Sequence, residues 1–305
     1  MGKLFSFIDR DCNYIFRIFG IKISFKHRSH FKLKPVTEYG LTTEKSTPQI
    51  IVSLTSYPAR IKTVNQCIST ILSQSVKPDR VILWLADSQF INKEEDLPEK
   101  LLELKKYGLE IRWCEDIKAL KKLLPSLREF PQDIIITADD DLYYPHNWLE
   151  SLYRVYLKNQ NCVCCDRISK LKFMDNKILK CGKKDYVPLC SSVPSFLNSI
   201  FGGSGCLFPP NSVSKEVFNV EMAYKMAYIA DDLWLWAMIV LNKTKIVEVN
   251  GDKSDFQMID GTVENSLCRK NKNRDFIKVY KELGEQYPQI IEYIKEELKI
   301  GVKND

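Results

Sequence analysis

Residues 133–145 read DIIITADDDLYYP, and this stretch decides the fold class. Three consecutive isoleucines, Ile134 to Ile136, are followed by Thr137 and Ala138. Such an uninterrupted run of apolar and β-branched residues is typical of a short strand that is buried on both faces. Three aspartates follow this strand directly, so a cluster of negative charge is expected at the end of a buried strand.

The three adjacent carboxylates are Asp139, Asp140 and Asp141. Without partners they would repel one another and lose hydration at the end of a buried strand. A divalent cation removes this cost, because Mg²⁺ and Mn²⁺ bind carboxylate oxygens and need only one or two of them when substrate phosphates complete the coordination. The alternative is an acidic loop that caps the next helix. The position at the end of a strand favours the metal site.

Strands and helices alternate from residue 49 onward. Residues 50–54, 81–85 and 109–113 read as strands, and each is followed by a segment with helical spacing of apolar residues. This order predicts a doubly wound, largely parallel sheet, in which ligands bind beyond the carboxyl ends of the strands. There is no GxGxxG or GxxxxGK[ST] motif after the first strand, which favours a nucleotide diphosphate held by a cation. The polar side chains expected at these ends are Thr55, Asp87, Asp116 and Asp139 to Asp141.

The composition is that of an ordinary soluble globular protein, with 45% hydrophobic and 28% charged residues in 305 positions. No apolar run is long enough for a transmembrane helix, and the N-terminus does not resemble a secretory signal. The ten cysteines have no spaced framework, which favours free thiols in a reducing cytoplasm.

The N-terminal arm, residues 1–34, holds eight basic and two acidic side chains and so carries the whole net charge of +6. Apolar residues recur in it at helical spacing, which predicts an amphipathic helix suited to the surface of an anionic membrane. A helix packed on the main domain is the alternative. Nucleic-acid binding is disfavoured, because the remaining chain is neutral. The apolar positions are Leu4, Ile8, Cys12, Ile15 and Phe19.

Two further segments in the second half are candidates for chemistry. Residues 202–205 read GGSG before a short strand at 206–208, and glycines let the backbone approach a ligand closely, although a flexible loop has the same composition. Asp231 and Asp232 begin an apolar helical stripe. Acids in a first helical turn interact with the helix dipole, or one of them serves as a general base. Adjacent helical residues point about 100° apart, so only one faces a substrate.

Five segments resemble bacterial GT-A glycosyltransferases of cell-surface polysaccharide synthesis, most of all the branch related to the large inverting family 2. In chain order they are IVSLTSYPARI, EDIKALKKLLPSL, IIITADDDLYYPHNWL, GGSGCLFPP and ADDLWLWAM, between residues 50 and 238. The resemblance implies an α/β GT-A fold, with a Rossmann-like nucleotide-binding half, a mixed and mostly parallel sheet, and C-terminal helices on the acceptor side.

The resemblance also implies roles for single residues. Asp139 and Asp141 would bind Mn²⁺ or Mg²⁺, with Asp140 sharing the role, and Asp232 would be the general base with Asp231 as its neighbour. The end of the second strand reads Ala-Asp-Ser where the family more commonly has Asp-Asp-Gly-Ser, which leaves the role of Asp87 open. The full set implied for binding the nucleotide sugar is Thr55, Tyr57, Arg60, Asp87, Asp116, Lys122, Asp139, Asp140 and Gly203.

The charge and pattern along the chain predict three regions: a basic amphipathic arm at 1–48, a GT-A catalytic domain at 49–250, and a C-terminal loop with helices at 251–305 that pack on the catalytic domain. The resemblance covers the second of these. It implies a hexosyltransferase (EC 2.4) that moves a sugar, with inversion, from a UDP-sugar to a saccharide acceptor. This acceptor would be lipid-linked, in lipopolysaccharide or related polysaccharide synthesis at the cytoplasmic face of a membrane, which the arm would contact. The alternatives are a sugar-phosphate nucleotidyltransferase and a catalytically inactive carbohydrate-binding or scaffold protein. Basic residues before the C-terminal helices would clamp the diphosphate or form a solvated face; they are Lys253, Arg269, Lys270, Lys272 and Arg274.

Overall fold

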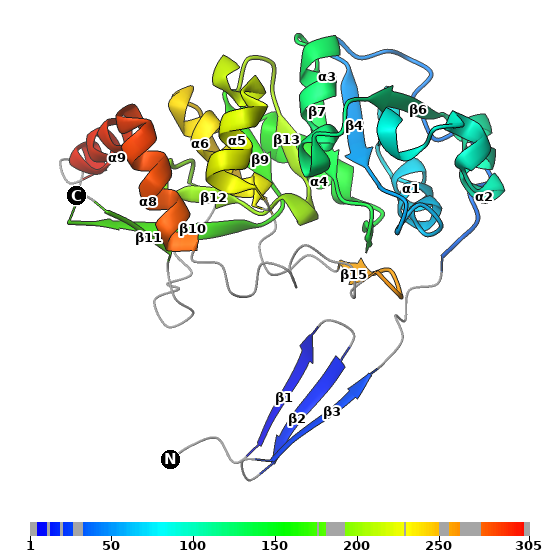
Figure 1. Ribbon diagram of the computed structural model, residues 1–305, viewed down its shortest axis with the longest axis horizontal. Coiled ribbons are helices and arrows are strands. Elements are labelled where there is room, and N and C mark those ends of the chain that lie inside the picture. Colours follow the sequence, from blue (N-terminus) through cyan, green and yellow to red (C-terminus); the bar gives the residue numbers. More distant parts are fainter. Residues whose placement is uncertain are drawn as a thin grey trace.

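The computed structural model describes residues 5–10, 13–18, 21–26, 33–175, 177–180, 193–228, 230–249, 256–262 and 276–301, with side-chain contacts from residue 33 onward. Its centre is a seven-stranded sheet in the order β14-β9-β13-β7-β4-β5-β6 (Figure 1). Of these strands, β13 runs antiparallel to both neighbours, and the other pairs are parallel. The predicted mixed, mostly parallel sheet is therefore confirmed. The strands are β4 Ile50–Thr55, β5 Arg80–Ala86, β6 Leu109–Cys114, β7 Ile134–Ala138, β9 Cys162–Cys165, β13 Cys206–Phe208 and β14 Lys245–Glu248.

Helices cover both faces of this sheet. Strand β7 shows why the isoleucine run is apolar throughout: Ile135 belongs to one hydrophobic core, and Ile134 and Ile136 belong to the other. Successive side chains of a strand point to opposite faces, so both faces must be covered. One core contains residues of the short helix η4 Lys118–Lys122 and of α3 Leu124–Glu129, α5 Val220–Ala227, α6 Asp231–Leu241, α8 Phe276–Gln286 and α9 Pro288–Gly301. The other contains residues of α1 Val64–Leu72, α2 Glu99–Leu102 and α4 Trp148–Tyr156.

Shorter elements complete the chain beyond the sheet. Strand β10 Ile168–Met174 pairs antiparallel with β11 Lys177–Lys180 as a hairpin, and β12 Asn198–Ile200 joins the other side of β10. Strand β8 Leu142–Tyr143 pairs with β15 Gln257–Met258. Helix α9 begins at Pro288, and α8 and α9 lie beside α6 (Figure 1). The short helices are η1 Asp87–Gln89, η2 Lys93–Asp96, η3 Glu103–Tyr107, η5 Gly202–Ser204 and η6 Lys215–Phe218.

The helix predicted in the N-terminal arm is wrong. The described part of the arm forms three antiparallel strands in the order β1-β2-β3, with bounds Phe5–Arg10, Asn13–Ile18 and Ile21–Lys26. The segment is rich in aromatic and β-branched residues, which favour strands. Strands separated by two residues also pair readily as hairpins. Membrane contact by this arm stays a prediction.

Residues just before the first sheet strand pack on the α/β domain. Val36 and Leu41 are buried in the core with α1 and α2, and the Gly40 amide donates a hydrogen bond to the carbonyl of Tyr107 at 2.8 Å. The five basic residues predicted before the C-terminal helices, Lys253, Arg269, Lys270, Lys272 and Arg274, lie outside the described residues.

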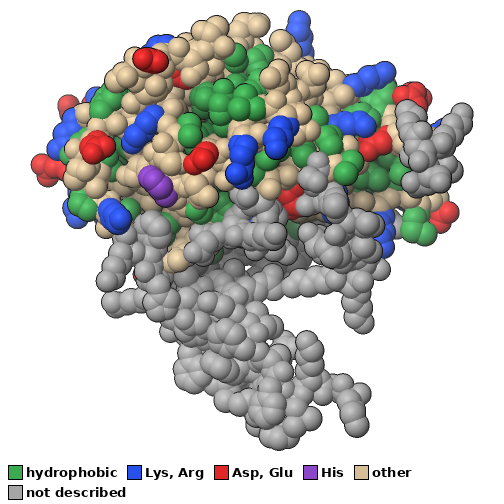
Figure 2. Space-filling view, turned by 180° about the vertical axis from the view of Figure 1, so that it is seen from behind, with side chains coloured by type: hydrophobic (Ala, Val, Ile, Leu, Met, Phe, Trp, Pro, Cys, Tyr) green, Lys and Arg blue, Asp and Glu red, His purple; other side chains and the backbone are tan. Residues whose placement is uncertain are grey.

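On the face shown in Figure 2, basic and acidic side chains of the described residues are interspersed among apolar ones. This distribution suits a domain in which the two signs of charge are balanced in number beyond the arm. Among the helices that the structure describes, none has the length and apolar character needed to cross a bilayer.

Candidate active site

The polar groups of the site gather at the carboxyl edge of the sheet around the end of β7. Asp139 follows the last residue of β7. Because β13 is antiparallel to β7, the glycine-rich turn η5 that precedes β13 lies at the same edge. Helix α6 begins at Asp231, as predicted, and brings its acid pair to this turn.

Lys122 connects the strand end to the acid pair of α6. Its Nζ lies 2.8 Å from Oδ1 of Asp139 and 3.1 Å from Oδ2 of Asp231, and its side chain is 7% exposed. Burial lowers the pKa of Lys122, but the charges of Asp139, Asp231 and Asp232 outweigh this effect and raise the pKa well above its usual value. The site therefore contains a fixed positive charge between two carboxylate-bearing elements.

Asp232 is held against the glycine turn. The backbone N–H of Gly202 donates a hydrogen bond to the Asp232 carboxylate, and a Cβ at residue 202 would lie only 2.3 Å from Oδ1 of Asp232. Burial and the charge of Asp231 raise the pKa of Asp232 to about 7, while Lys122 opposes the rise. Asp232 is thus a carboxylate that changes protonation state near neutral pH, at a position where only glycine fits beside it.

The glycine turn is also tied to the strand end. The hydroxyl of Tyr144 donates to the carbonyl of Gly203 at 3.0 Å and accepts a hydrogen bond from the amide of Asp139 at 2.7 Å. A Cβ at Gly203 would lie 3.1 Å from Oδ2 of Asp139. The indole of Trp148 donates to the carbonyl of Ser204 at 2.9 Å. Sequence reasoning missed Tyr144 and Trp148, although both follow the aspartate triplet closely and are nearly fully buried.

The second aspartate of the triplet points into a different network. Asp140 accepts hydrogen bonds from Ser56 and from Arg60, each at 2.6 Å, and Arg60 also lies 3.0 Å from Asp141. Burial raises the pKa of Asp140, and Arg60 opposes the rise. Arg60 is itself buried and donates to the carbonyl of Thr262 at 3.3 Å. Asp140 and Arg60, both predicted to bind nucleotide sugar, contact each other.

The chemistry of the two outer aspartates suits a small divalent cation, because both are carboxylates and the charge of one disfavours the charged form of the other. The described residues contain no group of three or more His, Cys, Asp or Glu side chains arranged to hold a metal ion. Two carboxylates suffice when a diphosphate completes the coordination. Asp139 is the most exposed of the triplet, with 33% of its side chain accessible. Burial and then the charge of Asp139 raise the pKa of Asp141 to about 7, and a cation would relieve both effects.

The remaining predicted donor-binding residues lie at the strand ends in separate contacts. Thr55 donates to the carbonyl of Trp84 at 2.8 Å, and the ring of Tyr57, whose pKa is raised by burial, lies 5.8 Å from the Arg60 guanidinium. Asp87 forms an exposed ion pair with Lys93. The structure thus brings Lys122, the acid pair and the glycine turn together around Asp139. Asp87 is instead paired with Lys93.

Asp116 anchors the short helix η4 that carries Lys122. It accepts hydrogen bonds from Lys121 at 2.8 Å, from Lys118, and from Gln89 at 3.1 Å. Burial raises the pKa of Asp116, but the hydrogen bonds from Lys118 and Lys121 outweigh it and lower the pKa to about 2. Asp116 therefore holds the start of η4 in place.

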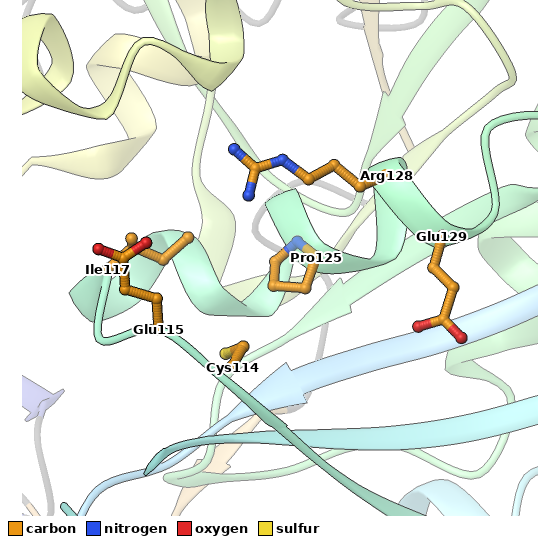
Figure 3. A pocket seen from close by; sticks show the side chains of 6 residues that line it. All are labelled: Cys114, Glu115, Ile117, Pro125, Arg128 and Glu129. Atoms are coloured by element: carbon orange, nitrogen blue, oxygen red, sulfur yellow. The ribbon is translucent and has the colours of Figure 1, made fainter. Parts of the chain in front are cut away.

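Two cavities, each of about 290 Å³, flank η4. The cavity in Figure 3 is lined by side chains from the end of β6 and from α3, and burial raises the pKa of the Cys114 thiol in it to about 11. That thiol is protonated at neutral pH and is not a nucleophile. None of the predicted site residues lines this cavity; its lining is Cys114, Glu115, Ile117, Pro125, Arg128 and Glu129. The other cavity reaches Asp231.

No family model matches the chain, and no curated protein sequence matches it. Among solved structures, residues 1–349 of S. aureus TarS in complex with UDP match at 13% identity and a TM-score of 0.44, over 68% of this chain and 59% of that one. The mannosyltransferase PcManGT from Pyrobaculum calidifontis, in complex with GDP-Man and Mn²⁺, matches at 10% identity and a TM-score of 0.46, over 90% and 80% of the two chains. GalNAc-T7 with UDP, GalNAc and Mn²⁺ matches at 8% identity and a TM-score of 0.44, over 72% and 45%.

These matches are similarities of fold, and this chain spans 59% of the length of the first TarS chain. The strand order and directions of this chain agree with the GT-A architecture expected from its sequence: a mostly parallel nucleotide-binding half, one antiparallel strand, and helices α8 and α9 at the C-terminus.

Proposed function

We propose that the chain is a metal-dependent glycosyltransferase that moves a sugar from a nucleotide sugar to a saccharide acceptor. One observation carries the proposal: buried Lys122 joins Asp139, at the end of the central strand, to Asp231, the neighbour of Asp232. Transfer of a sugar needs positive charge where a diphosphate departs and a base where the acceptor hydroxyl loses its proton. The network combines both in one connected site.

The donor side of the proposed reaction is formed by Asp139, Asp141 and Lys122. The two carboxylates would hold Mn²⁺ or Mg²⁺, which supplies charge neutralisation for the departing diphosphate. Lys122 contributes a permanent positive charge in a buried setting, where electrostatic interactions are strong. Thr55, Tyr57, Arg60, Asp87, Asp116, Asp140 and Gly203 would shape the pocket for the nucleoside and the sugar.

The acceptor side is formed by the acid pair. Asp232 accepts the proton of the acceptor hydroxyl at a carboxylate oxygen, and its pKa of about 7 suits a base that works at neutral pH. The N–H of Gly202 orients this carboxylate. The finer proposal is a UDP-sugar donor, a hexosyl group and inversion at the anomeric carbon. The acceptor would be lipid-linked, in surface polysaccharide synthesis at the cytoplasmic face of a membrane, which the basic composition of the arm supports.

The test is release of nucleoside diphosphate. The purified chain is incubated with Mn²⁺ and, in turn, UDP-glucose, UDP-galactose, UDP-GlcNAc and GDP-mannose, with and without simple glycosides as acceptors. We expect metal-dependent release from at least one donor, and loss of this release in Asp139→Asn. If no donor is cleaved, the proposal is wrong. Release of pyrophosphate from a nucleoside triphosphate and a sugar phosphate would instead identify a nucleotidyltransferase.

A further inference from the structure

A repeated Ala-Tyr pair marks a second feature next to the site. Residues 223–228 read AYKMAY, so Ala223 and Ala227 are four residues apart, as are Tyr224 and Tyr228. Residues four apart lie on the same side of a helix. Helix α5 and the residue that follows it therefore carry a small-residue face next to an aromatic face.

These two faces line the cavity of about 290 Å³ that reaches Asp231. Ala223, Ala227 and Trp234 are buried and line it, and the small alanines leave the space open. Tyr228 also lines the cavity and is 55% exposed. The volume is at the small end of the range for ligand sites, about 300 to 1,000 Å³, which suits one sugar ring and not a whole nucleotide sugar.

Two buried polar atoms of the cavity lining make no hydrogen bond within the described residues. They are the hydroxyl of Tyr224 and Oδ2 of Asp231, which lies 3.1 Å from Lys122 Nζ without hydrogen-bond geometry. Buried polar groups are normally paired, so such atoms need an explanation. A ligand hydroxyl can donate to the carboxylate of Asp231 and can either donate to or accept from the tyrosine hydroxyl.

The lining selects a neutral polyhydroxylated ring. The carboxylate of Asp231 disfavours phosphate, and the ammonium of Lys118, which also lines the cavity, is already paired with Asp116. The aromatic rings of Tyr224 and Tyr228, with centroids 5.5 Å apart at 76°, offer apolar surface for the C–H face of a sugar. We infer that this cavity is the subsite for one saccharide ring of the acceptor, with Tyr228 as its stacking wall and Tyr224 and Asp231 as its polar contacts. The inference rests on the proposed transferase function and names the residues that its acceptor contacts.

Direct binding tests the subsite without a transfer assay. Protein with ¹³C-labelled tyrosine rings is titrated with the methyl glycosides of glucose, galactose, mannose and GlcNAc, and the Tyr224 and Tyr228 signals are assigned from Tyr224→Phe and Tyr228→Phe. We expect saturable shifts of both signals with at least one glycoside. Tyr228→Ala should weaken that affinity about tenfold. Tyr39→Ala should leave it unchanged, because Tyr39 is also 55% exposed but lies outside the cavity.

Failure of the subsite and failure of the proposed function give different results. Cleavage of a donor to nucleoside diphosphate is measured without glycoside in the unaltered chain, and Tyr39→Ala should match it within about twofold, because Tyr39 lies outside the cavity. Donor cleavage without any glycoside-induced shift at Tyr224 and Tyr228 overturns the subsite and keeps the transferase. Absence of donor cleavage in the unaltered chain overturns the transferase itself. Equal glycoside affinity in Tyr228→Ala and the unaltered chain also overturns the subsite.

Discussion

Two buried cations hold the aspartate triplet, and they do so in different ways. Lys122 reaches from Asp139 to Asp231 on another helix, and Asp139 keeps a third of its side chain exposed. Arg60 pairs with the two neighbouring residues Asp140 and Asp141, and the side chains of both aspartates are largely buried. The three consecutive aspartates have different surroundings because β7 ends at Ala138 and the chain turns at Asp140 and Asp141, so successive side chains point in different directions. We expect the Lys122 network to contribute mainly to the rate of transfer, and the Arg60–Asp140 pair to contribute mainly to the stability of the pocket that it shapes.

The largest expected effect is on the Lys122 side. Asp232→Asn keeps the shape of the side chain and removes the proposed base, so the rate of transfer should fall about 10²- to 10⁴-fold. The measurement is kcat for formation of the glycoside product under saturating donor. The thermal midpoint should stay unchanged or rise, because a half-buried carboxylate whose pKa is raised to about 7 becomes a neutral amide. If this variant unfolds, Asp232 has a structural role, and the Lys122 and Arg60 networks no longer differ in function.

The largest expected effect on stability lies on the Arg60 side. Asp140→Ala leaves buried Arg60 with Asp141 as its remaining carboxylate. Because removing one partner of a buried ion pair is costly, the free energy of unfolding should fall by about 3 kcal/mol. Urea denaturation followed by circular dichroism measures this change. The matched control is Asp87→Ala, which breaks the exposed ion pair with Lys93 and should cost no more than about 1 kcal/mol. Equal losses in the two variants would contradict a stabilising role for the Arg60 network.

Substitutions in the glycine turn should have smaller effects on the rate, and they compare the carboxylates of Asp232 and Asp139 directly. Gly202→Ala places a Cβ 2.3 Å from Oδ1 of Asp232, so the carboxylate must move. A displacement of about 1 Å at a reacting group costs about 10²-fold in rate, which is the expected loss in kcat. Gly203→Ala meets Oδ2 of Asp139 at 3.1 Å and should cost less. The two variants are compared by kcat for transfer, and the reverse order would place the sensitive carboxylate at Asp139.

The sequence predicted the sheet well because its central strands β4, β5 and β7 are buried on both faces. The run Ile134 to Ile136 reports that burial directly, and the polar residues after each strand mark the ligand edge. The short strand Cys206–Phe208 and the start of α6 at Asp231 were also predicted correctly, since glycines precede the one and acids begin the other. Local chemistry was sufficient for these elements.

Partner choice over long distances was not predictable. Arg60 and Asp140 are 80 residues apart, and no spacing rule tells which carboxylate of a triplet a distant arginine selects. The arm was misassigned because a short apolar-rich segment fits both the three-to-four-residue spacing of a helix and the two-residue alternation of a strand. The repeat AYKMAY at residues 223–228 is consistent with a helix that lines a cavity, but it is equally typical of a helix packed in the core.

The smallest expected effect is a shift of pH dependence. A base must be deprotonated, so kcat/KM for the acceptor should rise as pH increases through about 7, the pKa of Asp232. The charged groups that act on Asp232 are Asp231, Lys122 and Asp139, and Lys122 lowers its pKa. Lys122→Met should therefore move the midpoint of the profile to higher pH. A profile of kcat/KM from pH 5 to 9 measures the shift, and Lys105→Met is the control, because Lys105 forms an exposed ion pair with Glu94 outside the site.

Protonation of Asp232 should also affect the free energy of unfolding, and in the opposite direction to its effect on activity. Because the folded-state pKa of Asp232 is raised to about 7, the folded chain binds more protons than the unfolded chain between about pH 4 and 7. The free energy of unfolding contributed by Asp232 therefore falls as pH rises through this window, while activity rises. In Asp232→Asn the fall should be shallower, as urea unfolding at pH 5 and pH 8 would measure. An identical fall in both proteins would assign it to other carboxyls, such as Asp141, whose pKa is also raised to about 7 and which contacts Arg60.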